Sequence, residues 1–149
     1  MKMTFEIERL KLEELRAFLQ KQADEAFPDL KDEVRLNMLA EKWAKNAEIC
    51  TCRDDDGSLI GMIAFYANRP ENVVAYIPHV YVNSEYRGKN LFSSMLLLVE
   101  DYVKEKGFSI IRLEVGKNNE KAQRAYFHNG FKLIGEGSED SYYFFFFFF

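Results

Sequence analysis

A short segment with two cations and a glycine, placed between a strand and a helix, has the composition of an anion-binding loop. The segment runs from Val80 to Phe92 and contains Arg87, Gly88 and Lys89 in succession. Backbone N–H groups at the beginning of a helix attract anions, and glycine lets the backbone approach a ligand closely. The segment therefore predicts a diphosphate site; a surface turn with two solvated cations is the alternative interpretation.

The spacing of the glycines excludes the common nucleotide-binding loops. The segment lacks the glycine spacing and the Lys-Ser/Thr end of a P-loop, and the chain contains no Gly-x-Gly-x-x-Gly sequence. An enzyme of another fold that uses this loop for a nucleotide is therefore the weakest hypothesis.

The elements that must position the loop follow from hydrophobic periodicity and from turn residues. Two amphipathic helices near the N-terminus are separated at Phe27-Pro28-Asp29, because proline disfavours a helical residue before it. The other predicted helices span residues 90–106 and 119–129, and the predicted strands span residues 3–7, 48–53, 59–67, 72–82, 109–115, 131–134 and 141 onward. The order βααβββαβαββ predicts a mixed α/β sheet.

Composition and charge narrow the class of protein. The 149 residues, 48% hydrophobic and 30% charged, predict one globular domain, residues 1–149. The net charge of −4 argues against a nucleic-acid partner and is a weak argument for a cationic one. We expect a cytoplasmic protein without a membrane partner, because no signal peptide or membrane-spanning stretch is visible. Cys50 and Cys52 predict two buried thiols rather than a metal site, since no further ligands lie nearby.

A second block of residues makes the loop more informative. The stretch Asn119 to Phe131 reads Asn-x-x-Ala-x-x-x-Tyr-x-x-x-Gly-Phe and follows the strand Leu113-Glu114-Val115. Together with Arg87-Gly88-Lys89-Asn90-Leu91-Phe92, it resembles the GCN5-related N-acetyltransferase (GNAT) family, whose coenzyme A loop reads Arg/Gln-x-x-Gly-x-Gly/Ala. The resemblance extends by motif from Leu59 to Gly135. It implies a GNAT-like fold, with a splayed central sheet flanked by helices.

The resemblance implies direct transfer of an acetyl group from acetyl-CoA to a primary amine in a ternary complex. In the family, the strand that carries Val80 and Val82 separates from the next parallel strand, and backbone N–H groups near Val82 polarise the thioester carbonyl. Pro78 fits such a break in pairing, because it cannot donate a ladder hydrogen bond. The family's Asn, here Asn119, contacts the cofactor arm. Its Tyr, here Tyr126, protonates the leaving thiolate; a core aromatic residue is the alternative.

The loop departs from the family pattern at two positions. Asn90 replaces a glycine, a mild change because Asn tolerates left-handed backbone angles. Phe92 replaces a small residue, so its side chain must point away from the diphosphate. The cofactor-binding residues that the resemblance implies are Val80, Val82, Arg87, Gly88, Lys89, Asn90, Leu91, Phe92, Asn119 and Tyr126.

The attacking amine needs a base that accepts its proton, and two residues are candidates. Glu114 is the first, because it lies on the polar face of its strand, and family members that acylate protein N-termini carry a Glu at this register. A solvated carboxylate or an ion pair with Arg112 is the alternative. His79 is the second candidate, with a structural histidine as the alternative. With Tyr126, these two residues complete the predicted catalytic set, and no metal is expected.

The acceptor stays open between an amino sugar, a small metabolite amine, a polyamine and a protein N-terminus. A small-molecule amine is favoured because no charged stripe for docking a peptide is visible. Specificity is expected from the two N-terminal helices, the turn Phe27–Lys31 and the stretch Tyr66–Pro70. The tyrosines expected to line the pocket are Tyr66, Tyr76 and Tyr81.

Two alternatives to a small-molecule acetyltransferase remain. The first is a catalytically impaired acyl-CoA-binding module, which Asn90 and Phe92 alone favour. The second is a protein N-terminal acetyltransferase. A homodimer is left open as the oligomeric state.

The C-terminal residues are the least ordinary part of the sequence. Six consecutive phenylalanines, Phe144 to Phe149, follow Tyr142 and Tyr143. The first few can complete a strand, whereas an exposed run of this kind would promote aggregation. A sequence artefact, an end buried against another element, an oligomer contact and an apolar anchor are the interpretations left open.

Overall fold

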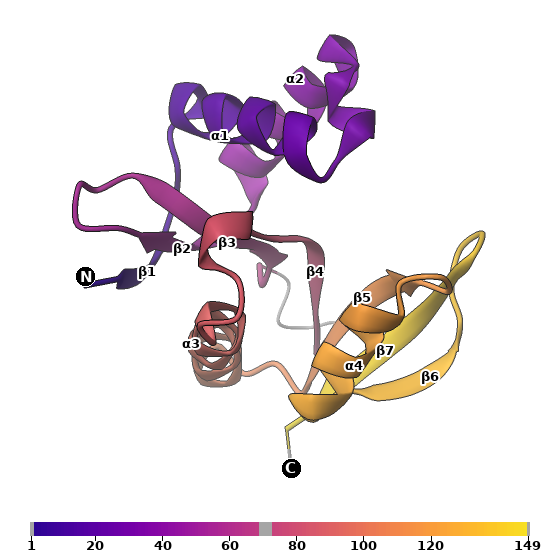
Figure 1. Ribbon diagram of the computed structural model, residues 1–149. Coiled ribbons are helices and arrows are strands. Elements are labelled where there is room, and N and C mark those ends of the chain that lie inside the picture. Colours follow the sequence, from indigo (N-terminus) through magenta and orange to yellow (C-terminus); the bar gives the residue numbers. More distant parts are fainter. Residues whose placement is uncertain (1, 69–72, 149) are drawn as a thin grey trace. The chain divides into compact units, whose positions relative to one another are not determined.

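The computed structural model describes residues 2–68 and 73–148, whose helices and strands are drawn in Figure 1. These residues form two compact units. The first contains residues up to Phe65 together with His79–Val99, and the second contains Tyr66–Pro78 together with the residues from Glu100 onward. The strand β4 (Val74–Val82) and the helix α3 (Leu91–Glu105) contribute residues to both units. The single domain expected from the length stays a prediction.

Three antiparallel strands form the sheet of the first unit. They are β1 (Thr4–Glu8), β2 (Glu48–Arg53) and β3 (Leu59–Tyr66). All residues of β3 except the last are buried, as its unbroken apolar sequence predicts. Cys50 and Cys52 on β2 are free and fully buried, which confirms the prediction of two buried thiols.

The two N-terminal helices also belong to the first unit. α1 (Leu12–Glu25) and α2 (Glu33–Asn46) are separated by the 3₁₀ helix η1 (Pro28–Lys31), where the sequence predicts a break. Asp32 caps α2, because its carboxylate accepts hydrogen bonds from the backbone N–H groups of Val34 and Arg35. The residues that α1 and α2 bury include Leu15, Leu19, Leu36, Ala40 and Trp43.

Strand β4 has two different pairing environments along its length. Its first residues pair in parallel with β5 (Ile110–Gly116), and the last pair is Tyr76 with Arg112. The pairing ends before Pro78, which confirms the break predicted from this proline. Where β4 ends in the first unit, the N–H of Asn83 donates to the carbonyl oxygen of Ile60 on β3 at 2.8 Å.

The second unit contains three further strands and a short helix. β7 (Ser141–Phe147) lies between β5 and β6 (Lys132–Glu136) and is antiparallel to both. The helix α4 (Glu120–His128) connects β5 to β6 along the chain. The strand order β1-β2-β3-β4-β5-β7-β6 and the element order confirm the predicted mixed α/β fold.

The first four residues of the phenylalanine run, Phe144–Phe147, belong to β7, an interior strand of the sheet. Phe144 pairs with Leu113 of β5 and Leu133 of β6, and its side chain is fully buried. The ring of Phe146 lies 5.3 Å from that of Phe131, measured between centroids. The first phenylalanines therefore complete a strand, as the sequence analysis allows; Phe144 is buried and Phe145–Phe147 are half-buried, whereas Phe149 lies outside the described residues.

Helix α3 ends as its sequence predicts. Gly107 follows its last turn with φ +93°, a left-handed angle that glycine adopts without strain. Met95, Val99 and Val103 are fully buried along one side of the helix. Within residues 2–68 and 73–148, no helix is both long and apolar enough to cross a membrane.

Candidate active site

The loop between β4 and α3 has the backbone geometry of an anion-binding turn. After the 3₁₀ helix η3 (Ser84–Tyr86), Gly88 has φ +80° and Asn90 has φ +61°. The carbonyl oxygen of Asn90 accepts the backbone hydrogen bond of Ser94 at 3.1 Å, so α3 begins directly after the loop. The first N–H groups of a helix have no partner inside it and are available to an anion. Asn90 thus adopts a left-handed angle, which asparagine tolerates.

The Arg87 side chain forms hydrogen bonds within the first unit. Its Nε donates to the carbonyl oxygen of Val82 at 3.0 Å, and Nη2 donates to the Glu25 carboxylate at 3.4 Å. Glu25, the last residue of α1, also accepts from the Tyr81 hydroxyl at 2.6 Å and the Ser84 N–H at 2.8 Å. The two carboxylate oxygens of Glu25 therefore connect the end of α1 to the end of β4 and to the loop.

The remaining predicted loop residues differ in exposure. Lys89 is exposed, with Nζ 5.5 Å from the centroid of the Tyr86 ring. Leu91 is buried and Phe92 is half-buried at the beginning of α3. Both loop cations are therefore exposed, but Arg87 makes hydrogen bonds to Val82 and Glu25, whereas Lys89 lies near the Tyr86 ring.

The end of β4 places different side chains on its two faces. Val80 and Val82 are half-buried on one face, as the alternation of a strand requires. His79 and Tyr81 lie on the other face, where both contact α1. The four residues belong to the first unit.

His79 is held between two aromatic rings and an amide. Its Nε2 lies 2.6 Å from Oε1 of Gln22, and its ring centroid lies 4.6 Å from that of Phe27 and 5.0 Å from that of Trp43. With the Gln22 oxygen as the acceptor, Nε2 carries the proton and Nδ1 keeps its lone pair. Burial lowers the pKa of His79 from 6.5 to about 4, so the imidazole is neutral at pH 7.

Asn119 and Tyr126 belong to α4 in the second unit. The Asn119 side chain caps the helix, because its Oδ1 accepts from the Ala122 N–H at 3.1 Å. Tyr126 is only 8% exposed, and its ring contacts those of Phe131 and Phe144. Burial raises the pKa of Tyr126, so the phenol keeps its proton at neutral pH.

Glu114 is bound to the turn between β6 and β7. Its Oε2 accepts from the hydroxyl of Ser141 at 2.6 Å, and from the hydroxyl and N–H of Ser138 at 2.7 and 3.1 Å. Burial alone would raise its pKa, but these hydrogen bonds and the nearby Arg112 charge outweigh burial, and the pKa of Glu114 is lowered. A lowered pKa favours the carboxylate form and weakens it as a proton acceptor.

The tyrosines expected to line the acceptor pocket have separate environments. Tyr81 is buried and donates to Glu25 in the first unit. Tyr76 is half-buried in the second unit, where burial raises its pKa. Tyr66 is half-buried in the same unit, and Arg69 and Pro70 from the expected specificity stretch lie outside the described residues.

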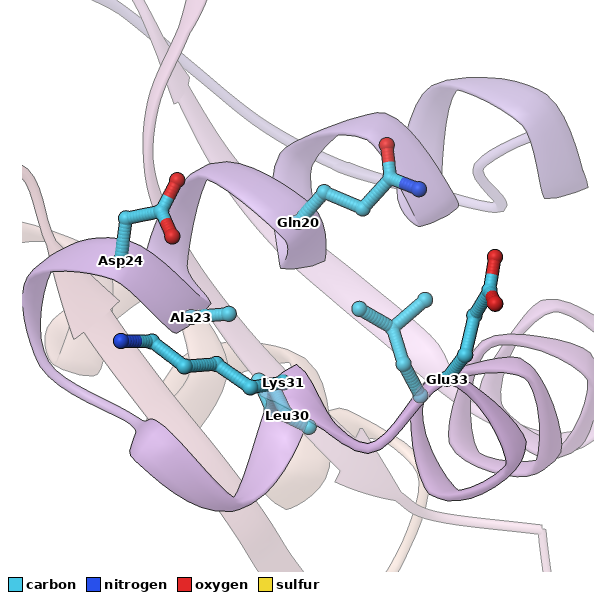
Figure 2. Close-up of a pocket in the computed structure, with 7 residues that line it drawn as sticks. Gln20, Ala23, Asp24, Leu30, Lys31 and Glu33 are labelled. Atoms are coloured by element: carbon cyan, nitrogen blue, oxygen red, sulfur yellow. The ribbon is translucent and has the colours of Figure 1, made fainter.

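A pocket of about 270 Å³ lies between α1, η1 and α2 (Figure 2). Asp24 and Lys31 are drawn on one side of it and Glu33 on the other, and its apolar lining comes from Ala23, Leu30 and Leu36. The sequence predicts acceptor specificity from these helices and this turn. Sequence reasoning missed Glu25 and Gln22, because only the packing of α1 brings them to β4.

The chain belongs to the acetyltransferase (GNAT) family. The family model matches residues 12–131, which include the loop before α3 and the whole of α4. This match confirms the family and the acetyltransferase class that the motifs indicate, and the chain is a GNAT N-acetyltransferase.

Solved structures of low sequence identity share the fold. The PaiA N-acetyltransferase from Thermoplasma acidophilum, in complex with coenzyme A, is 19% identical, with a TM-score of 0.74 over 97% of this chain and 99% of that chain. A nourseothricin acetyltransferase is 23% identical, with a TM-score of 0.60 over 68% of this chain and 65% of that one. A Bacillus anthracis structure in complex with acetyl coenzyme A is 24% identical, with a TM-score of 0.63 over 72% and 67% of the two chains. The search of curated proteins returned no match.

Proposed function

We propose that the chain transfers an acetyl group from acetyl-CoA to the primary amine of a small molecule by direct attack in a ternary complex. The observation that carries this proposal is the loop before α3, where Gly88 and Asn90 adopt left-handed angles immediately before the helix begins. Such a loop directs backbone N–H groups toward a diphosphate.

The residues of the loop fit a coenzyme A diphosphate. A Cβ at Gly88 would meet nothing within 4 Å, so the backbone at this position is open to a ligand. Lys89 is exposed and can add positive charge. Arg87 contributes indirectly, because its hydrogen bonds to Val82 and Glu25 hold the loop against β4.

In the proposed reaction, acetyl-CoA supplies an activated acetyl thioester. The neutral amine attacks the carbonyl carbon, the carbon–sulfur bond breaks, and the Tyr126 phenol gives its proton to the departing sulfur. The N–H groups near Val82 stabilise the negative charge that develops on the carbonyl oxygen. Val80, Val82 and Asn119 orient the cofactor arm.

Two residues stay as proposals for the base. His79 is neutral at pH 7 and keeps a lone pair on Nδ1, but its low pKa makes it a weak base. Glu114 is a carboxylate whose Oε2 already accepts three hydrogen bonds. A proton relay through water from either residue is compatible with the proposal, and pH–rate profiles of His79→Gln and Glu114→Gln distinguish them.

The acceptor proposed for this chain is a small molecule. The pocket between α1 and α2 carries the two carboxylates of Asp24 and Glu33 and one cation, Lys31, which suits an ammonium group. Among the similar structures, the nourseothricin acetyltransferase is named for a small-molecule antibiotic. A protein N-terminus is the alternative acceptor.

Thermal unfolding with and without acetyl-CoA tests the proposal. At a free concentration one hundred times its Kd, a ligand of the native state adds about 2.7 kcal/mol of stability, which raises the melting temperature measurably. S-Acetylpantetheine, which lacks the diphosphate, is the matched comparison for the loop contacts. Amines and short peptides are then screened as acceptors by measuring the release of coenzyme A.

Each outcome distinguishes one hypothesis. Stabilisation with release of coenzyme A on addition of small amines supports the proposal. Release with peptides alone indicates an N-terminal acetyltransferase. Stabilisation without release for any acceptor indicates the impaired binding module, and no stabilisation at millimolar acetyl-CoA contradicts the proposal.

A further inference from the structure

Arg112 of β5 lies between two tyrosine rings in the second unit. Its guanidinium carbon is 5.0 Å from the centroid of the Tyr76 ring and 5.3 Å from that of the Tyr143 ring. A guanidinium that stacks on aromatic rings keeps its N–H groups directed outward in its own plane. The two rings therefore hold Arg112 as an oriented hydrogen-bond donor.

No anion pairs with this guanidinium among residues 2–68 and 73–148. The ion pairs formed there involve Arg9, Arg53, Arg87 and Lys117, and the buried Nε of Arg112 has no hydrogen-bond partner. Glu114 influences Arg112 electrostatically, but its Oε2 accepts from Ser138 and Ser141 instead. The Nε of Arg112 is thus a buried donor without an acceptor among the described residues, and a bound anion would supply one.

Arg112 occupies a particular place in the sheet. Its pairing with Tyr76 is the last step of the parallel ladder between β4 and β5, after which the ladder ends. Along β5, Arg112 and Glu114 lie on the face opposite to the buried Ile111, Leu113 and Val115. Tyr126, the proton donor of the proposed function, belongs to the same unit as Arg112.

We propose that Arg112 binds an acid group of the acceptor, so that the substrates are amines that also carry a carboxylate. This inference rests on the proposed function and narrows its substrate class. A planar carboxylate matches the planar fork of a guanidinium, and Tyr76 and Tyr143 fix the plane in which the acid is bound. A phosphate group shares the oxyanion chemistry and is a separate arm of the test.

Matched pairs of amines test the substrate class. L-phenylalanine is compared with phenethylamine, L-lysine with cadaverine, and O-phosphoethanolamine with ethanolamine, each by coenzyme A release. In the wild type, the acid-bearing amine should have a kcat/KM at least about tenfold higher than its acid-free partner. The reason is that only the acid-bearing amine forms a hydrogen-bonded charge pair with Arg112. Preference for the carboxylates over the phosphate assigns the acid as a carboxylate.

Variants of Arg112 test whether this side chain causes the preference for acid-bearing amines. Arg112→Gln should lower kcat/KM for the acid-bearing amines at least about tenfold more than for their acid-free partners, mainly through KM. Arg112→Lys keeps the charge without the fork and should recover part of the preference. Arg35→Gln, which removes an exposed arginine of α2, is the matched control.

A binding measurement tests the same site without turnover. In protein labelled with ¹⁵N at arginine Nε, the buried Nε–H of Arg112 is assigned by its loss in Arg112→Lys. Sodium acetate, N-acetyl-L-phenylalanine and phosphate are titrated at constant ionic strength, with chloride as the reference. We expect a saturable shift of this resonance with the carboxylates.

The two measurements separate the possible failures. If acetyl-CoA stabilises the protein, acid-free amines react equally well and the Arg112 resonance responds only as it does to chloride, the inference is overturned and the proposed function stands. If acetyl-CoA has no effect, the proposed function fails, while a saturable carboxylate shift at Arg112 still supports an anion site. The absence of both effects overturns both.

Discussion

Two charged side chains, Glu25 in the first unit and Arg112 in the second, have opposite environments. Glu25 accepts hydrogen bonds from the Tyr81 hydroxyl, the Ser84 N–H and Arg87, and these donors lower the pKa of its carboxyl group. Arg112 is flanked by the rings of Tyr76 and Tyr143, and its buried Nε has no acceptor within the described residues.

The comparison distinguishes a charged group whose hydrogen bonds are formed within the protein from one that keeps a donor for a ligand. The Glu25 carboxylate accepts its hydrogen bonds from its own unit, so few acceptor positions are left for a ligand. Its role is to hold the loop before α3 in place. A guanidinium without an acceptor can gain a new hydrogen bond on binding. We therefore expect changes around Glu25 to alter stability and cofactor affinity, and changes in the second unit to alter turnover and acceptor choice.

The largest expected effect concerns the second unit. Tyr126→Phe removes the proposed proton donor and should lower kcat by about 100-fold or more, whereas the Kd for acetyl-CoA should stay close to the wild-type value. Steady-state kinetics and calorimetry measure the two quantities. Tyr102→Phe, on α3, is the control. Wild-type turnover in Tyr126→Phe would remove Tyr126 from the mechanism.

The pH dependence of stability tests the burial of His79 in the first unit. Burial lowers the pKa of His79 from 6.5 to about 4, so the unfolded chain binds more protons between these values. The free energy of unfolding should therefore fall as the pH is lowered through this window, by at most about 3 kcal/mol.

Denaturant unfolding at a series of pH values measures this dependence. His79→Gln should lose most of the slope between pH 6.5 and about 4, and His128→Gln, at an exposed position of α4, should keep it. An unchanged slope in His79→Gln would mean that other groups cause it.

A smaller effect tests the structural role of Glu25. Glu25→Ala leaves the buried Tyr81 without its acceptor and should destabilise the protein by about 1–3 kcal/mol. It should also raise the Kd for acetyl-CoA, because the loop loses its connection to α1, while kcat at saturation changes little. Glu41→Ala at an exposed position of α2 is the control. A large fall in kcat without loss of stability would instead place Glu25 in the chemistry.

The smallest effect concerns the loop backbone at Asn90. Asn90 has φ +61°. Asn90→Ala should cost about 1 kcal/mol of stability and weaken acetyl-CoA binding, because alanine disfavours left-handed angles. Asn90→Gly should bind acetyl-CoA as well as the wild type does. Equal Kd values for the two variants would show that the angle is unimportant for the cofactor.

Local signals predicted most of the fold. Pro78 marks the end of the β4–β5 pairing, Asn90 takes a left-handed angle before α3, and Gly107 and Gly130 do so after α3 and α4. These positions are predictable because the restriction lies in the residue itself or in its neighbours along the chain. The motif around Asn119 was predictable for the same reason, since its residues lie on one short helix.

Contacts between distant residues were not predictable in this way. Arg87 was predicted to bind the cofactor, which stays a prediction; its hydrogen bond to Glu25, 62 positions earlier in the chain, could not be foreseen. Glu114 was predicted to act as a base, which stays a prediction; the hydrogen bonds that its Oε2 accepts from Ser138 and Ser141 could not be foreseen. The phenylalanine run gave no indication of its neighbours, because its composition is the same in an exposed tail and in an interior strand.

The sequence by itself determined the order of the elements and the family, because these depend on local restriction and on short motifs. Only the tertiary structure decided which polar groups are satisfied. Pairing between strands and packing of α1 on β4 bring donors to Glu25, while Arg112 is left among aromatic rings. Hydrogen bonds between residues far apart in the chain depend on the folded arrangement, which no local pattern encodes.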